Sequence, residues 1–195
     1  MASDITICNL ALARLGDEAT VASISPPEGS AQAEHCERFY PIARDTLLAM
    51  HEWGFATRCV ALAPLASNGP QAWRFSYALP ADNIRPVSVL SPSPPNIPQR
   101  YAAEGGNILT DQAGALLRYV WRATDVSRFP PLFVDALAWL LASYLAGVVL
   151  KGDAGAAMSK SCLQFFSAMA DRAMQSDANG QHAADHFVPS GIAAR

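Results

Sequence analysis

The stretch from Phe129 to Leu150 constrains the fold more than any other part of this sequence. It reads FPPLFVDALAWLLASYLAGVVL, and Asp135 is its only acidic or basic residue. A helix on a protein surface carries a polar face, and this segment has none. Its two prolines suit the first turn of a helix, and Gly147 with the Lys-Gly-Asp that follows indicates the end. The sequence therefore predicts an apolar central helix over 130–150, covered on most sides by other elements.

The same stretch is long enough to be tested as a membrane span. Asp135 would place a charge inside that span, and no cluster of Lys or Arg flanks it to set an orientation. The N-terminus also lacks the basic and apolar regions of a signal peptide. We therefore expect a chain that is made in the cytoplasm and has no membrane partner.

Three further segments repeat their apolar residues at steps of three and four, which is typical of helices with one buried face. These segments are 5–15, 33–50 and 158–173. Ser3 and Ser30 stand where they can cap the first two helices. Together with the central helix, these segments predict a bundle of about four helices formed by residues 1–58 and 129–176.

Between the helical halves the pattern changes to alternation. Large apolar residues alternate with smaller or polar ones over 73–79 and 117–121, which is typical of strands with one buried face. Gly105-Gly106 separates two short strand-like segments and predicts a hairpin. Four prolines within 91–98 predict an extended surface loop. Residues 59–128 are therefore expected to form a small antiparallel β-sheet inserted into the bundle, which makes the fold class α+β.

From residue 177 onward the sequence becomes small and polar and loses its periodicity. The large apolar residues of this last segment are Phe187, Val188 and Ile192. We interpret 177–195 as a flexible tail that docks on a partner through these three side chains. His182 and His186 have the spacing of two helical metal ligands, but no second ligand pair accompanies them, and metal binding is not expected.

Two places in the sequence raise the alternative of a hydrolase-type enzyme. Asp135 is a carboxylate near the start of an apolar helix, but no second carboxylate or histidine is positioned to complete an acid–base pair. We interpret it as the partner of Arg44 in a structural ion pair. His35 beside Cys36 suggests a thiol nucleophile with its base, but neighbours on a helix point in different directions. No glycine-rich phosphate-binding motif occurs, and no cofactor is expected.

The cysteines and tryptophans have simple structural interpretations. The four cysteines are widely spaced, which favours reduced core thiols over a disulfide framework. Trp53, Trp73 and Trp121 could form a shelf for a ligand, although aromatic residues at such positions more often make core. A third alternative, a helical ligand-binding module, would show one large apolar cavity beside Trp53 and Trp139.

A series of short motifs, taken in order, resembles one protein family. The motifs are Asn9-Leu10-Ala11-Leu12, Leu15-Gly16, Ala43-Arg44-Asp45-Thr46-Leu47-Leu48, His51-Glu52-Trp53-Gly54-Phe55-Ala56, Ser76-Tyr77-Ala78-Leu79-Pro80-Ala81-Asp82, Glu104-Gly105-Gly106-Asn107-Ile108-Leu109-Thr110-Asp111, Leu117-Arg118-Tyr119-Val120 and Phe133-Val134-Asp135-Ala136-Leu137-Ala138. In this order they resemble the tail tubular protein A family of tailed, mostly short-tailed, bacteriophages, over roughly residues 3–175. The family commonly has proline where Glu52 stands and asparagine where Gly54 stands.

The resemblance implies a structural virion protein without catalytic activity. Members of that family are head-to-tail adaptors, which form a homo-oligomeric ring, typically twelvefold, between the portal protein and the tail tube or nozzle. The resemblance therefore implies assembly in the host cytoplasm and a final place in the virion, lining the channel for DNA. The net charge of −3 and the absence of any basic run suit a wall that DNA passes without sequence recognition.

Overall fold

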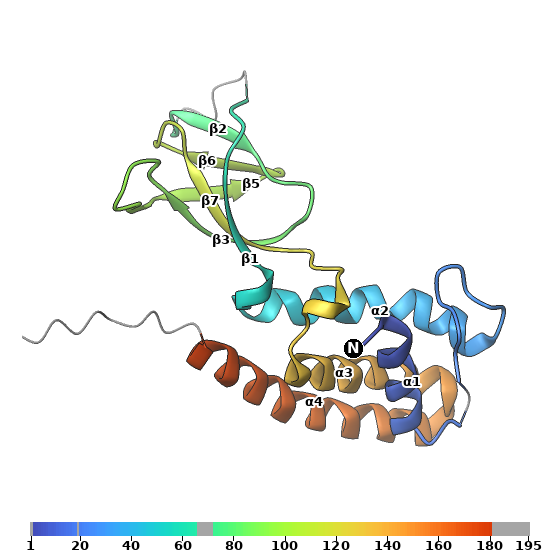
Figure 1. Cartoon of the computed structure of the whole chain (residues 1–195). Coiled ribbons are helices and arrows are strands. Elements are labelled where there is room, and N and C mark those ends of the chain that lie inside the picture. Colours follow the sequence, from blue (N-terminus) through green and yellow to red (C-terminus); the bar gives the residue numbers. More distant parts are fainter. Residues whose placement is uncertain (1, 19, 66–71, 181–195) are drawn as a thin grey trace, which may run out of the picture.

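The computed structural model in Figure 1 describes residues 2–18, 20–65 and 72–180. These residues form an α+β fold of four α-helices and two small antiparallel sheets, as the sequence predicts for the fold class. The helices pack together into a helical body. The sheets form a β part that stands away from one side of this body (Figure 1). Because the β part lies between α2 and α3 in the chain, it is an insertion, as expected.

The first three helices begin and end close to the predicted residues, and the fourth is longer. The helical elements are α1 Asp4–Arg14, α2 Ala31–Met50, α3 Pro131–Val149 and α4 Gly152–Gly180, with short 3-10 helices η1 Gly54–Ala56 and η2 Val126–Arg128. Both predicted caps are confirmed, because the hydroxyl of Ser3 accepts a hydrogen bond from the Thr6 N–H and that of Ser30 from the Ala33 N–H. Each cap satisfies one of the amide groups left free in the first turn of a helix.

The apolar stretch forms α3, and its central position is confirmed. α3 packs against α1, α2 and α4, and Leu137, Leu141 and Leu145 are completely buried. By length and composition this one helix of the described residues could cross a membrane, yet more than half of its most apolar window is buried inside the fold. Its composition therefore matches its place in the core of the helical body.

A tight reversal joins α3 to α4. Lys151 and Gly152 both have positive φ angles, 57° and 54°, which turn the chain back along α3. A Cβ atom at Gly155 would lie 2.8 Å from the carbonyl oxygen of Ala146, so only glycine permits this close approach of the two helices. α3 and α4 therefore run side by side (Figure 1).

α4 is longer than the sequence pattern predicts. It continues through Asp177 to Gly180, so the first four residues assigned to the flexible tail are helical, and that boundary is wrong. Contacts from Asp177 to the end of α2, given below, hold this last turn. The other residues named for the tail lie outside the described residues: Phe187, Val188, Ile192, His182 and His186.

The β part contains two sheets where the sequence analysis expects one. The strands are β1 Thr57–Ala61, β2 Phe75–Ala78, β3 Asn83–Leu90, β4 Pro98–Gln99, β5 Tyr101–Glu104, β6 Asn107–Thr110 and β7 Leu116–Trp121. They pair antiparallel in the orders β1-β7-β3-β4 and β2-β6-β5. The expectation of a single sheet is wrong, because β7 pairs with β1 and β3 whereas β6 pairs with β2 and β5. The β5–β6 hairpin is confirmed, with positive φ at both Gly105 and Gly106.

A second, smaller core lies between the two sheets. Its completely or almost completely buried side chains include Tyr77 and Ile108 from one sheet and Val89, Leu117 and Tyr119 from the other. The β part starts at Thr57, two residues before the predicted boundary, because β1 follows η1 directly. Val126 of η2 packs on the core of the helical body, so the chain has already returned to that body before α3 begins.

Candidate functional site

The helical body and the β part meet where α2 ends. Trp53 is 1% exposed there, and its indole N–H donates a hydrogen bond to the carbonyl of Leu47, 3.0 Å away. Trp53, Phe55, Phe129 and Phe133 form an aromatic cluster with ring centroids 4.9 to 6.1 Å apart, mostly edge to face. The cluster joins η1 to the start of α3, and both segments leading into and out of the β part are anchored on it.

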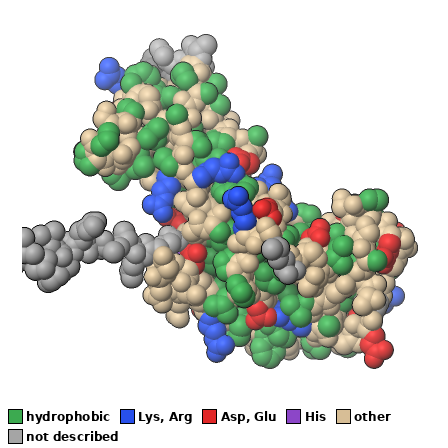
Figure 2. Space-filling view, in the orientation of Figure 1, with side chains coloured by type: hydrophobic (Ala, Val, Ile, Leu, Met, Phe, Trp, Pro, Cys, Tyr) green, Lys and Arg blue, Asp and Glu red, His purple; other side chains and the backbone are tan. Residues whose placement is uncertain are grey.

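Ion pairs surround this region, which we call the junction. Asp45 of α2 accepts two hydrogen bonds from Arg44, and its second oxygen lies 2.8 Å from Nε of Arg122, just after β7. Arg118 of β7 lies 3.8 Å from Glu52. Figure 2 shows several Lys or Arg side chains, with acidic ones beside them, between the two parts of the molecule. The charges thus hold the β part against the end of α2.

The base of the β part has its own polar contacts at the junction. The guanidinium of Arg58 lies 3.9 Å above the ring of Trp121 and pairs with Asp82 at 3.0 Å. The hydroxyl of Tyr119 donates to the same carboxylate, 3.0 Å away. Burial and this hydrogen bond raise the pKa of Tyr119, so the phenol stays a neutral donor. Asp82 therefore ties β1 and β7 to the turn that precedes β3.

The predicted ion pair between Asp135 and Arg44 is wrong. Asp135 pairs with Arg14 of α1, which also donates to the backbone carbonyl of Asp135 at 2.9 Å and lies 4.1 Å from the ring of Trp139. Arg44 is bound to Asp45 instead. Burial lowers the pKa of Arg14, and the charge of Asp135 opposes this shift. Asp135 therefore has the predicted structural role with a different partner, because α1 and not α2 covers this face of α3.

His35 and Cys36, the residues of the second enzymatic alternative, are not paired with each other in the structure. Cys36 is completely buried, and its thiol shares a hydrogen bond with Cys8 of α1. That hydrogen bond and burial raise the pKa of the Cys8 thiol well above its usual value. His35, the next residue on α2, is only partly buried. The Cys36–His35 pairing of the enzyme hypothesis therefore has no counterpart in the hydrogen bonds of the described residues.

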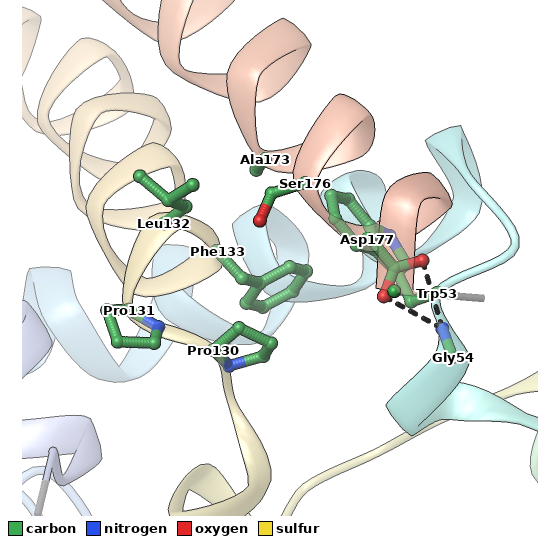
Figure 3. Close-up of a pocket in the computed structure, with 10 residues that line it drawn as sticks. Trp53, Gly54, Pro130, Pro131, Leu132, Phe133, Ala173, Ser176 and Asp177 are labelled. Atoms are coloured by element: carbon green, nitrogen blue, oxygen red, sulfur yellow. Dashed lines mark hydrogen bonds between the residues drawn. The ribbon is translucent and has the colours of Figure 1, made fainter. Parts of the chain in front are cut away.

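An apolar pocket with a volume of about 430 Å³ opens beside the aromatic cluster (Figure 3). We call it the junction pocket. It is lined by Trp53, Gly54, Pro130, Pro131, Leu132, Phe133, Ala173, Ser176, Asp177 and Gly180. The start of α3 forms one wall and the end of α4 the other. This cavity lies beside Trp53, as the ligand-binding alternative requires, but Trp139 is not part of it and stacks on Phe165 at 4.7 Å.

Asp177 fixes the shape of the junction pocket. Both of its carboxylate oxygens accept from the backbone N–H of Gly54 at 3.1 Å, at the start of η1 (Figure 3). Nε2 of His51 lies 3.2 Å from the same group. The last turn of α4 is thereby bound to the end of α2. The sequence pattern gave no sign of this role for Asp177, because the residues around it are polar and show no periodicity. The unpaired amide groups at the start of a short helix favour a nearby acceptor, and this is the signal that could have indicated it.

Residues 2–18, 20–65 and 72–180 contain no cluster of side chains that could hold a metal ion. No three His, Cys, Asp or Glu side chains within these ranges come together as metal ligands would.

Trp73, a proposed shelf residue, is covered by Arg100 at 4.5 Å in the β part, away from Trp53 at the junction. The three shelf tryptophans therefore do not form one surface.

Comparison with family models and with curated proteins found no match for this chain. Five of the eight motifs that resemble the tail tubular protein A family each contribute a residue to the junction. Asp45, Trp53, Asp82, Arg118 and Phe133 come from five different motifs, and all of them take part in the contacts of the junction. The other three motifs lie elsewhere, at α1 and its end and in the β5–β6 hairpin.

Proposed function

We propose that this protein is a structural head-to-tail adaptor of a tailed bacteriophage. Copies of it form a ring, twelvefold by the resemblance, between the portal protein and the tail tube or nozzle, and DNA passes through without sequence recognition. The observation that carries the proposal is the convergence of five resembling motifs on the junction. A junction that sets the position of a protruding β part gives a subunit two separate bodies with which to contact other proteins.

The surface of the helical body supports a ring of this kind. A closed ring needs two different patches on each subunit, one for each neighbour. Ile42 on α2 and Phe165 on α4 are large apolar side chains that are 52% and 53% exposed. Figure 1 places α3 between α2 and α4, so the two helices that carry these side chains are separated by the central helix. We propose that the Ile42 side of one subunit contacts the Phe165 side of the next.

Electron microscopy of the purified protein, alone at high concentration and mixed with its portal protein, tests the adaptor proposal. We expect rings in at least the second condition. The proposal fails if no ring forms in either condition and no complex with the portal is found by size-exclusion chromatography. Thermal unfolding of the same sample serves as the control that the protein is folded.

A mixing experiment tests the arrangement of subunits within the ring. Ile42→Glu and Phe165→Glu should each abolish rings. Thermal unfolding should stay unchanged for Ile42→Glu, because Ile42 is exposed, and should shift only slightly for Phe165→Glu, whose half-exposed ring loses its stacking on Trp139. Each variant keeps the patch that the other has lost. A mixture of the two should therefore give dimers that cannot close. Rings formed by either variant alone would contradict this arrangement, although not the adaptor role itself.

The docking role of Phe187, Val188 and Ile192 stays a prediction, since these residues lie outside the described part of the chain. Removing 181–195 keeps all of α4 and should weaken portal binding while leaving the helical body folded. Unchanged portal binding would remove the segment from the proposed interface.

A further inference from the structure

We propose that, in the isolated protein, the junction pocket is filled by residues 181–195 of the same chain, with Phe187 and Val188 as the side chains that enter it. The inference concerns the free subunit and does not depend on the adaptor role. Any partner that binds the pocket or this segment would first have to separate them. Three observations lead to this assignment: the chemistry of the pocket, the point at which the chain leaves it, and the spacing of the apolar residues that follow.

The walls of the junction pocket suit apolar side chains. Pro130, Pro131, Leu132 and Phe133 form one wall, and Ala173 lies on the other. A volume of about 430 Å³ lies within the range of pockets that bury a bound group, and removing such walls from water is favourable. The only ionisable side chain of the lining is Asp177, whose carboxylate is already bound to Gly54 and His51. The occupant is therefore expected to be uncharged and apolar.

The chain leaves the described structure at the edge of this pocket. Gly180 is both the last described residue and one of the residues that line the pocket. The sequence continues for 15 residues, 181–195. Phe187 is seven positions beyond Gly180, and seven residues span at most about 23 Å at roughly 3.3 Å each. This length is enough to leave the end of α4, turn, and return to the pocket.

The following segment also has the matching composition. Residues 181–186 are small, polar or ionisable, whereas Phe187 and Val188 are adjacent and apolar. They could fill neighbouring parts of one cavity. Ile192 lies four positions further on, beyond Pro189 and Gly191, and provides a natural control.

The tether decides between the same chain and a second copy. A segment joined to the pocket rim by six intervening residues has an effective concentration in the millimolar range. A second copy at micromolar concentration supplies far less of the same segment. The occupant in the free subunit is therefore the chain's own segment.

Hydrogen exchange measured by mass spectrometry on the full chain tests this proposal. The amides to follow are those of 173–180 and 53–56, which border the pocket. In the double variant Phe187→Ala, Val188→Ala, we expect exchange of these amides to be faster by about tenfold, because the end of α4 opens more often without its cover. Ile192→Ala should leave the rates unchanged. Equal rates in the wild type and the double variant would overturn the proposal.

Two further measurements separate the proposal from its rivals. The protection should persist through about a hundredfold dilution of the wild type, since a tethered segment does not depend on concentration; loss of protection on dilution would assign the pocket to a second copy and overturn the proposal. Ala173→Trp fills the pocket from within and should speed exchange in 185–190. Unchanged exchange there, in a variant that still unfolds cooperatively, would also contradict the assignment. No portal protein is present in these experiments, so their failure leaves the adaptor proposal untouched.

Discussion

The helical body and the β part are stabilised by different kinds of contact. In the helical body all four helices contribute to one continuous apolar core around α3. Among the described residues of the β part, a cluster of seven buried apolar side chains forms the smaller core: Leu62, Tyr77, Val89, Ile108, Ala115, Leu117 and Tyr119. A structure of this size buries a smaller fraction of its surface, so its own core contributes less stability. The helical body is therefore stabilised by packing around one helix, whereas the β part depends more on specific polar contacts.

Tyr77 shows how the β part compensates for its small core. Its ring is 2% exposed, and its hydroxyl donates to the carbonyl of Gln112 at 2.8 Å and accepts from the N–H of Gly114 at 2.9 Å. Thr110 donates to the carbonyl of Arg100 in the same region. Such hydrogen bonds stabilise loops that have no regular partner strand. In the β part, individual side chains therefore add hydrogen bonds to the regular backbone pairing of the two sheets.

The largest effect is expected from Phe133→Ala, in the core of the helical body. Phe133 is completely buried and contacts three other aromatic rings, so its removal should lower the free energy of unfolding by about 3–5 kcal/mol. Chemical denaturation measures the change. Leu132→Ala, next to it and 37% exposed, is the matched control and should cost much less. A small effect of Phe133→Ala would show that the body does not depend on this cluster.

Leu117→Ala makes the equivalent change in the β part. Leu117 is completely buried in the smaller core, and the expected cost is about 2–5 kcal/mol. Because Leu117 belongs to the smaller core and not to the core around α3, hydrogen exchange should become faster in 57–121 while the amides of α3 keep their protection. Arg118→Ala, on the opposite face of β7, is the control. Equal loss of protection in both regions would mean that the two parts unfold as one unit.

The smallest effect is expected from Asp45→Ala, which breaks the contact between the two parts. Asp45 joins Arg44 of the body to Arg122 of the β part, but both its own side chain and that of Arg122 are partly exposed. The expected loss is therefore about 1 kcal/mol or less, and it should shrink at high salt. Asp171→Ala, an exposed acid on α4, is the control. A loss as large as that of Leu117→Ala would show that the β part depends on the junction more than on its own core.

The sequence alone determined the elements whose signals are local. The apolar composition of 131–149 has no other stable place in a water-soluble fold than the interior, so its burial could be predicted. The caps at Ser3 and Ser30 and the Gly105-Gly106 hairpin depend on the chemistry of a few neighbouring residues, and they are confirmed. These features can be predicted without knowing which elements pack against them.

Which elements contact one another could be seen only in the folded chain. Asp135 binds Arg14 because α1 crosses α3 at that turn, and periodicity shows only that a face is covered, not which helix covers it. β7 joins β1 in preference to β6, and α4 extends to Gly180 because Asp177 finds the amide of Gly54, 123 positions away in the chain. The junction pocket, too, is formed by segments that lie far apart in the sequence. Contacts of this kind depend on the three-dimensional path of the whole chain, which no local pattern of residues contains.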